Sequence, residues 1–156
     1  MKVLNYKQRI IDVVIEKGKE YAVGYSVTLN MLINDPILQD IQIQKLIKWL
    51  NFYCYGNNFR RNKKRLYVVG ASEIGTVNQG LHMHLIIMHN YDTDRKTKDI
   101  EDFIWKKWHV LINSTSKTKS NGKLVYFERI YDLVGLSFYN TKTLYHFSNE
   151  FNLQYF

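Results

Sequence analysis

The sequence has few of the residues that cross-link, bend or anchor a chain. Its single cysteine, Cys54, excludes an internal disulfide bond and fits a reducing compartment. The only proline, Pro36, follows Asp35 and marks a turn. No apolar run reaches the length of a membrane span, and the first eight residues lack the apolar core of a signal peptide. We therefore expect a protein that stays in the cytoplasm.

Acidic residues are also in the minority. Lysine and arginine number 22 against 14 aspartates and glutamates, giving a formal net charge of +8 and a pI near 9.5. This excess favours an anionic partner, most often a nucleic acid and less often an acidic membrane surface, although it also serves solubility alone. With 156 residues, 46% of them hydrophobic and 15% aromatic, the chain suits one folded domain with a sizeable core.

Hydrophobic periodicity predicts helices and strands in a recognisable order. The expected helices span residues 5–18, 38–55, 97–112 and 132–143, and the expected strands span residues 21–30, 65–73, 81–89 and 123–130. The middle six elements have the βαββαβ order of a ferredoxin-like or RNA-recognition-motif-like fold. The predicted class is therefore α+β, with an antiparallel sheet that carries helices on one face and presents functional groups on the other.

A basic segment joins the second predicted helix to the second predicted strand. Residues 56–65 form an expected loop with one aromatic residue and five cations: Arg60, Arg61, Lys63, Lys64 and Arg65. Most charge runs are merely solvated. Because this run stands immediately before the strand that carries Glu73, we expect its cations to bind the phosphates of DNA.

Two histidines stand two residues apart in an apolar run. Side chains alternate across a strand, so His82 and His84 point to one face of the predicted strand 81–89. If Glu73 pairs directly opposite one of them, its carboxylate shares that face; opposite His82, the pairing also brings the small Ala71 opposite His84. Two imidazoles and a carboxylate suit a divalent ion that keeps positions open for a substrate. The alternative is that both histidines are structural.

A tyrosine and a lysine stand three residues apart on the last predicted helix. Tyr139 and Lys142 therefore share a helix face. A tyrosine oxygen attacks phosphorus well once deprotonated, and its reference pKa of about 10 calls for a nearby metal, base or cation. The chain holds 12 tyrosines, so a tyrosine near a lysine is expected by chance, and this pair gains meaning only from its order with the histidines.

Taken together, three motifs in this order resemble the HUH endonuclease superfamily, in particular the single-tyrosine Rep initiators of rolling-circle replication. Residues 25–30, Tyr-Ser-Val-Thr-Leu-Asn, look like the first-strand motif, although Asn30 replaces its last threonine. The pair around Met83 matches the His-hydrophobic-His signature, with an acidic residue upstream. Residues 139–142 match the Tyr-X-X-Lys motif of the nucleophile helix. The resemblance covers about residues 21–145, within one nickase domain of residues 1–156.

The resemblance implies a chemistry and a set of partners. Glu73, His82 and His84 would hold Mg²⁺ or Mn²⁺, Tyr139 would be the nucleophile, and Lys142 would orient metal or phosphate. The substrate would be single-stranded DNA at the replication origin of a plasmid, phage or virus, cut and rejoined through a 5′-phosphotyrosine in the host cytoplasm. A host helicase and polymerase would assist, and a second cleavage would need another round or a homodimer.

Other readings stay open at this point. A single-tyrosine transposase shares the histidine motif, but such enzymes usually have a glutamine four residues after the nucleophile, where this chain has Thr143. A non-catalytic single-strand nucleic-acid-binding module would stack bases on tyrosines without cutting DNA. Tyr131 and Tyr145 are alternative nucleophiles. His89 falls on the opposite face of a regular strand, so it is not expected in the site.

Overall fold

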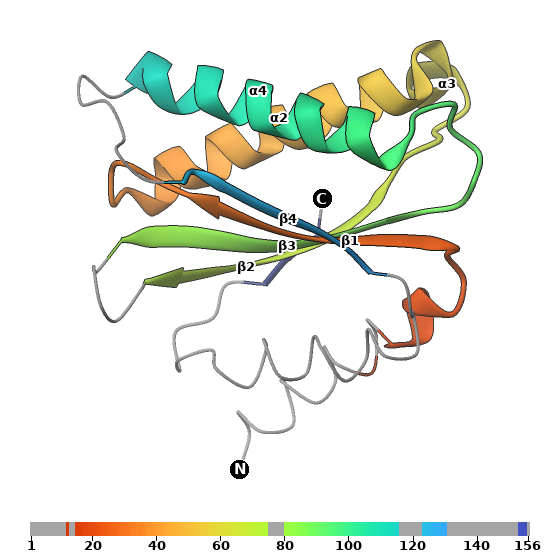
Figure 1. Ribbon diagram of the computed structural model, residues 1–156, viewed down its shortest axis with the longest axis horizontal. Coiled ribbons are helices and arrows are strands. Elements are labelled where there is room, and N and C mark those ends of the chain that lie inside the picture. The colour runs from red at the N-terminus through yellow and green to blue at the C-terminus, as the bar shows by residue number, and fades with distance from the viewer. Residues whose placement is uncertain (1–11, 13–14, 75–79, 116–122, 131–152, 156) are drawn as a thin grey trace.

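The computed structural model describes residues 12, 15–74, 80–115, 123–130 and 153–155 of the chain, the side chains of positions 71, 73 and 153–155 excepted. Within these residues the protein is α+β, with an antiparallel sheet and two long helices against one of its faces (Figure 1). The predicted fold class is thus confirmed at this level. None of the described helices is long and apolar enough to cross a membrane.

The described elements follow the predicted βαββαβ succession, with two additions. A five-residue helix, α3, interrupts the segment that was expected to be a loop, and a short strand, β5, forms in the tail. In chain order the elements are β1 (Val23–Asn30), α2 (Pro36–Tyr55), α3 (Asn57–Arg61), β2 (Tyr67–Ile74), β3 (Leu81–His89), α4 (Thr97–Thr115), β4 (Val125–Ile130) and β5 (Leu153–Tyr155).

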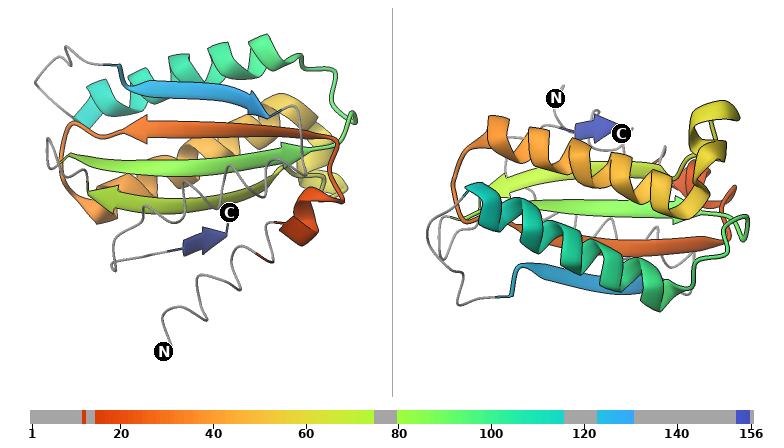
Figure 2. Two further views of the ribbon diagram at one scale, coloured as in Figure 1. Left: turned by 60° about the horizontal axis from the view of Figure 1, so that its bottom comes forward. Right: turned by 90° about the horizontal axis from the view of Figure 1, so that it is seen from above.

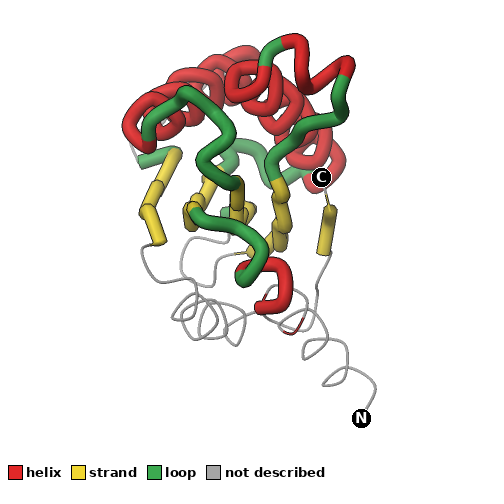
Figure 3. Tube along the Cα trace, turned by 90° about the vertical axis from the view of Figure 1, so that its right-hand side faces the viewer, coloured by secondary structure: helices red, strands yellow, loops and turns green. Residues whose placement is uncertain are grey.

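Strand β3 lies at the centre of the sheet, whose order is β4-β1-β3-β2-β5, with every neighbouring pair antiparallel. Helices α2 and α4 lie side by side across one face (Figure 2). Viewed from the α3 end, both helices lie on one side of the strands, while the helical turn at residues 15–18 lies on the other (Figure 3). The sheet therefore separates a helix-covered face from a second face.

Local sequence explains where α2 begins and ends. The Asp35 carboxylate accepts hydrogen bonds from the backbone N–H groups of Ile37 and Leu38, at 2.9 and 3.1 Å, so it caps the helix that Pro36 starts. At the other end Gly56 has φ +53° and ψ −128°, a conformation that favours glycine, and the chain turns there into α3.

Side chains alternate strictly along β3. Leu81, Met83 and Leu85 are each less than 5% exposed and pack in the main core beneath α2 and α4. His82 and His84 are only partly buried and belong to the second face. The helix-covered face thus holds the core, and the histidine pair lies on the side that the two long helices leave uncovered.

His89 also follows this alternation, because it is buried on the helix-covered side, away from the other two histidines, as expected. Its Nδ1–H donates to the carbonyl of Asn90, so Nε2 accepts a hydrogen bond from the Tyr25 hydroxyl at 3.0 Å. Burial, which disfavours the charged imidazolium, lowers the pKa of His89 below its ordinary value of 6.5. This bond ties the first residues of β1 to the end of β3.

The buried imidazole predicts that acid destabilises the protein. Because the pKa of His89 is lower in the folded than in the unfolded state, the unfolded chain binds more protons as the pH falls below about 6.5, and stability declines. Replacing His89 by glutamine should reduce the difference in unfolding free energy between about pH 8 and about pH 5, measured by urea denaturation. The same exchange at His109, a partly exposed residue of α4, is the control. Equal pH dependence in wild type and His89→Gln would contradict this account.

Candidate metal and nucleic-acid site

The rings of His82 and His84 lie next to each other on the face of β3 opposite α2 and α4. Their centroids are 4.9 Å apart and their planes are nearly perpendicular, at 84°. Two imidazoles at this separation can direct one nitrogen each toward a common point. The spacing of two residues on a regular strand is what brings them together.

A backbone contact sets the tautomer of the first ring. The Nδ1 atom of His82 lies 3.1 Å from the carbonyl oxygen of Gly80, which can only accept a hydrogen bond. Nδ1 therefore carries the proton, and in the neutral ring the lone pair is on Nε2. This is the arrangement that histidine ligands of metals commonly have, with the second nitrogen donating to a backbone carbonyl.

A hydroxyl from the neighbouring strand holds the second ring. The Nδ1 atom of His84 lies 3.0 Å from Oγ1 of Thr28, its direct partner in the β1–β3 register. This contact orients the His84 ring from outside the candidate site. Sequence reasoning placed Thr28 inside the first-strand motif without giving it a role, and the signal that could have found it was the pairing of β1 with β3.

The β2–β3 register is the one that the candidate metal site requires. Glu73 lies directly opposite His82, and Ala71 lies directly opposite His84. Opposite positions in an antiparallel pair belong to the same face, so the backbone assigns position 73 to the face of the two histidines. The side chain of Glu73 lies outside the described part of the structure. Among the side chains that are described, no three His, Cys, Asp or Glu residues cluster closely enough to hold an ion.

The donor set fits the expected ion. Two neutral imidazoles and one carboxylate can bind a divalent cation through nitrogen and oxygen, and they leave positions open for substrate oxygens. His82 presents the required tautomer, and its ring neighbours that of His84. The register supplies the acidic position. These three residues are therefore the ones that could hold Mg²⁺ or Mn²⁺.

Tyr139 and Lys142 lie outside the described residues, as do the alternatives Tyr131 and Tyr145. The structure does reveal a further tyrosine on the same face. Tyr126 of β4 pairs with Thr28 from the side opposite to His84, and its ring is 49% exposed.

Tyr126 also has a cation beside it. The Nζ atom of Lys123 lies 4.7 Å from the centroid of the Tyr126 ring. Position 126, in the row that contains Thr28 and His84, thus offers an aromatic surface and a positive charge together. Sequence reasoning missed this residue, although the alternation of the predicted strand 123–130 could have assigned it a face.

The basic segment does not lie beside the histidine pair. It enters β2 at Tyr67, whereas Glu73 lies near the far end of that strand, so Arg65 and Glu73 are separated by roughly 26 Å of extended chain. Part of the segment is helical, because Arg60 and Arg61 belong to α3, which corrects the expectation of a loop. The helix is one turn long, and Gly56 separates it from α2.

Three of the five basic residues have contacts away from the histidine pair, in α2, in α3 and in the loop after β3. The Arg60 guanidinium lies 5.1 Å from the Phe52 ring centroid, and that of Arg65 lies 5.9 Å from the Phe59 ring centroid. Lys64 pairs with Asp92 at 3.9 Å. The remaining two are Arg61 and Lys63, both exposed. Any phosphate that these cations bind therefore lies at the end of the sheet remote from His82.

The contact between Thr28 and His84 predicts an indirect effect on metal binding. Thr28→Val keeps the shape of the side chain but removes the hydroxyl that orients the ring, so we expect Mn²⁺ to bind roughly 10- to 100-fold more weakly, as measured by calorimetry. Ser26→Ala is the matched control, because Ser26 lies two residues from Thr28 on the same face of β1, and it should bind Mn²⁺ like the wild type. An unchanged affinity in Thr28→Val would show that the hydroxyl does not support the site.

Comparison of the chain with protein-family models, with curated proteins and with solved structures gave no match. The features that indicate a function are therefore those of the site itself. They are the histidine pair, its two Nδ1 partners and the register that places Glu73 opposite His82.

Proposed function

We propose that the protein is a metal-dependent endonuclease of the HUH type that nicks and rejoins single-stranded DNA. The observation that carries the proposal is the pair His82 and His84, whose Nδ1 atoms have hydrogen-bond partners, on the sheet face opposite α2 and α4. Glu73 opposite His82 supplies the acidic position. The order of these residues along the chain, with Tyr139 and Lys142 after them, supports the same assignment.

The strand order supports the fold part of this proposal. In a βαββαβ chain, two right-handed crossovers interleave the strands and give the order 4-1-3-2 with every neighbour antiparallel. The first four strands here have the order β4-β1-β3-β2. We therefore assign the protein a ferredoxin-like sheet of the HUH type, in which the face opposite α2 and α4 carries the chemistry. Strand β5 extends it beyond β2.

The proposed reaction is a transfer of the phosphodiester to tyrosine. When bound at Glu73, His82 and His84, Mg²⁺ or Mn²⁺ supplies positive charge that polarises the scissile phosphate. The Tyr139 oxygen gives its proton to solvent and forms a bond to phosphorus, while the bond from phosphorus to the 3′ oxygen breaks and that oxygen takes up a proton from solvent to leave as a 3′-hydroxyl. Lys142 positions the phosphate and stabilises the phenolate.

The products determine the biological role that we propose. The enzyme holds the 5′ end as a phosphotyrosine, and the free 3′-hydroxyl can prime synthesis. Because the covalent link keeps a phosphodiester, attack by a later 3′-hydroxyl reverses the step and joins two ends without an external energy source. Cutting at an origin and rejoining after one round is what the initiator of rolling-circle replication must do.

The alternatives differ from the proposed initiator either in the DNA sequence that they prefer or in the product that they form. A transposase would cut and join the same way at the ends of a mobile element, so only the preferred sequence separates it from an initiator. A bare binding module would use Tyr126 and Lys123 to hold DNA on the same face and would make no covalent product. Nicking itself thus distinguishes the enzyme from the module.

The first test is incubation with labelled single-stranded DNA that includes the replicon's own origin, with Mn²⁺ or with EDTA, followed by a denaturing gel. We expect a labelled band linked to protein in Mn²⁺ and none in EDTA. Binding without any linked band would favour the non-catalytic module and make the histidine pair structural.

The second test identifies the nucleophile. Tyr139→Phe should abolish the covalent adduct and leave DNA binding nearly intact, because it removes one oxygen and keeps the ring. Tyr126→Phe is the matched control and should form the adduct at the wild-type level. Adduct that persists in Tyr139→Phe and disappears in Tyr126→Phe would move the nucleophile to β4.

A further inference from the structure

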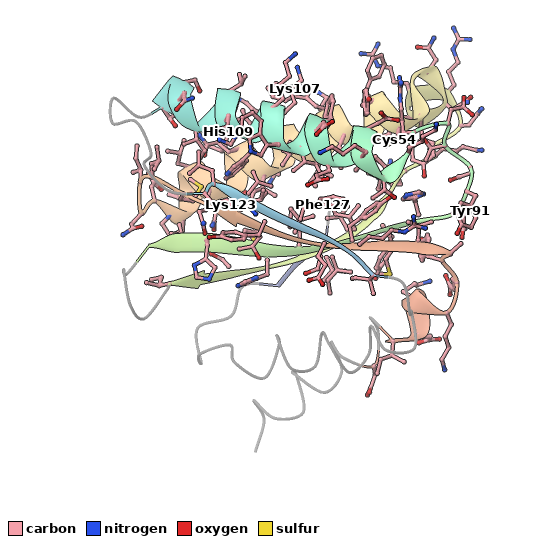
Figure 4. All side chains as sticks on the ribbon, viewed as in Figure 1. Cys54, Tyr91, Lys107, His109, Lys123 and Phe127 are labelled. Atoms are coloured by element: carbon pink, nitrogen blue, oxygen red, sulfur yellow. The ribbon has the colours of Figure 1, made fainter. Side chains whose placement is uncertain are left out.

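A cleft of about 660 Å³ opens in the helix layer, on the opposite side of the sheet from the histidine pair. It lies between the last turns of α2 and the middle of α4, and the loop after β3 closes one end. Figure 4 labels Lys107 and Cys54, which line it from α4 and α2. The volume is within the range of small-molecule sites, about 300–1,000 Å³.

A stacked pair of aromatic rings in the cleft has a cation beside each member. The Arg95 guanidinium lies 4.1 Å from the centroid of the Tyr53 ring, which stacks on Phe103 at 4.3 Å and 17°. Lys107 follows, with its Nζ atom 5.6 Å from the Phe103 ring centroid and 5.3 Å from that of Trp49. These contacts show that planar and cationic groups pack against the faces of these rings.

One ring of the cleft remains open to a ligand. Phe52 is 46% exposed, although it is a large apolar side chain at a wall of the cleft. Arg60 from α3 lies 5.1 Å from its centroid. A flat group entering the cleft would meet the Phe52 ring beside a cation.

The charge around the cleft is strongly positive. Segments 56–65 and 91–96, together with Lys107, contain eight cations and two carboxylates. Of these carboxylates, Asp92 accepts a hydrogen bond from the Tyr55 hydroxyl at 3.1 Å and lies 3.9 Å from Lys64. The surroundings therefore favour an anionic ligand over a neutral or cationic one.

The cleft is suited to binding and offers no thiol chemistry. Burial raises the pKa of the Cys54 thiol to about 11, so the thiol stays protonated at neutral pH and does not act as a nucleophile. The Arg95 side chain is held by a hydrogen bond from its Nε to the carbonyl of Tyr53, at 3.1 Å. The walls are thus partly fixed before a ligand arrives.

We propose that this cleft is a second binding site for single-stranded DNA, independent of the metal. An unpaired base stacks on Phe52 between the walls formed by Trp49 and Phe103, and its flanking phosphates bind Lys107 and Arg60. Stacking is tolerant of base identity, so the site holds a strand without reading its sequence. This site goes beyond the proposed nicking reaction and does not require it.

A proline-rich peptide is the main competitor, because such peptides also dock in grooves lined by aromatic rings. A peptide of that kind carries no obligatory charge, whereas DNA presents one phosphate for each nucleotide. Eight cations against two carboxylates around this cleft favour the nucleic acid over the peptide.

The test is the anisotropy of a fluorescent oligothymidylate, titrated with the full-length protein in EDTA so that no metal-dependent cutting occurs. We expect Phe52→Ala to weaken binding roughly 5- to 100-fold, the range for losing one stacked base. Trp105→Ala is the matched control, because Trp105 is similarly exposed, at 52%, and lies on α4 outside the cleft. It should bind like the wild type.

A second pair of variants tests the charge. Lys107→Glu should weaken binding and lower its salt dependence, whereas Lys106→Glu, the adjacent exposed residue outside the cleft, should change both much less. Losses of equal size in both members of either pair, or no loss in Phe52→Ala, would overturn the proposal, as would stronger binding of a polyproline peptide than of the oligonucleotide.

The two proposals can fail separately. In EDTA, His82→Ala and His84→Ala should bind the oligonucleotide with an affinity close to that of the wild type, and Phe52→Ala should still bind Mn²⁺ like the wild type. If the wild type never nicks DNA but Phe52→Ala weakens oligonucleotide binding, the cleft proposal stands and the nickase proposal fails. If the wild type nicks DNA but Phe52→Ala binds the oligonucleotide unchanged, only the nickase proposal stands.

Discussion

The pairing register of β3 with its two neighbours is the constraint on which the rest of the structure depends. A slip of one residue against β1 or β2 would turn Met83 and Leu85 toward the face opposite the two long helices and place His82 and His84 beneath α2 and α4. Burying two imidazoles there would require new hydrogen-bond partners, while two large apolar side chains would lose their packing. The core that stabilises the sheet therefore also fixes the face on which the histidines lie.

The same register prepares the candidate site before any ion binds. His84 meets the Thr28 hydroxyl because the two residues are direct cross-strand partners, and Glu73 stands opposite His82 for the same reason. The Gly80 carbonyl fixes the proton of His82 on Nδ1. Ligand orientation thus follows from main-chain pairing, which is rigid, so little side-chain order has to be imposed at the moment of binding.

Strict alternation made much of this predictable. Strand 81–89 was expected with the bounds it has, because it is a short apolar run that contains the two histidines, and the separation of His89 from them follows from the two-residue period of a strand. The position of Glu73 needed one further assumption, a hairpin that pairs Glu73 with His82 or with His84, and the first of these two registers is the one observed.

Features that depend on short or distant interactions were not predictable. Helix α3 is a single turn without periodicity, and β5 has three residues. Ile41 of α2 is 47% exposed although it is a large apolar residue in a helix that packs on the sheet. The aromatic cleft was also unforeseen, since Tyr53 and Phe103 are distant in sequence and meet only when α2 packs beside α4.

The location of the basic segment has a consequence for how DNA would be held. The segment connects α2 to β2, so its cations lie at one end of the sheet, between the helix layer and the strands. Among them, Arg60 contacts Phe52 at the wall of the cleft. The histidine pair lies near the far end of β2, roughly 26 Å of extended chain from Arg65. A short oligonucleotide could therefore fill the proposed cleft or the proposed nicking site, but not both. A longer strand that filled both would gain from the high effective concentration of its second segment, and its affinity would exceed that of either site without any new contact.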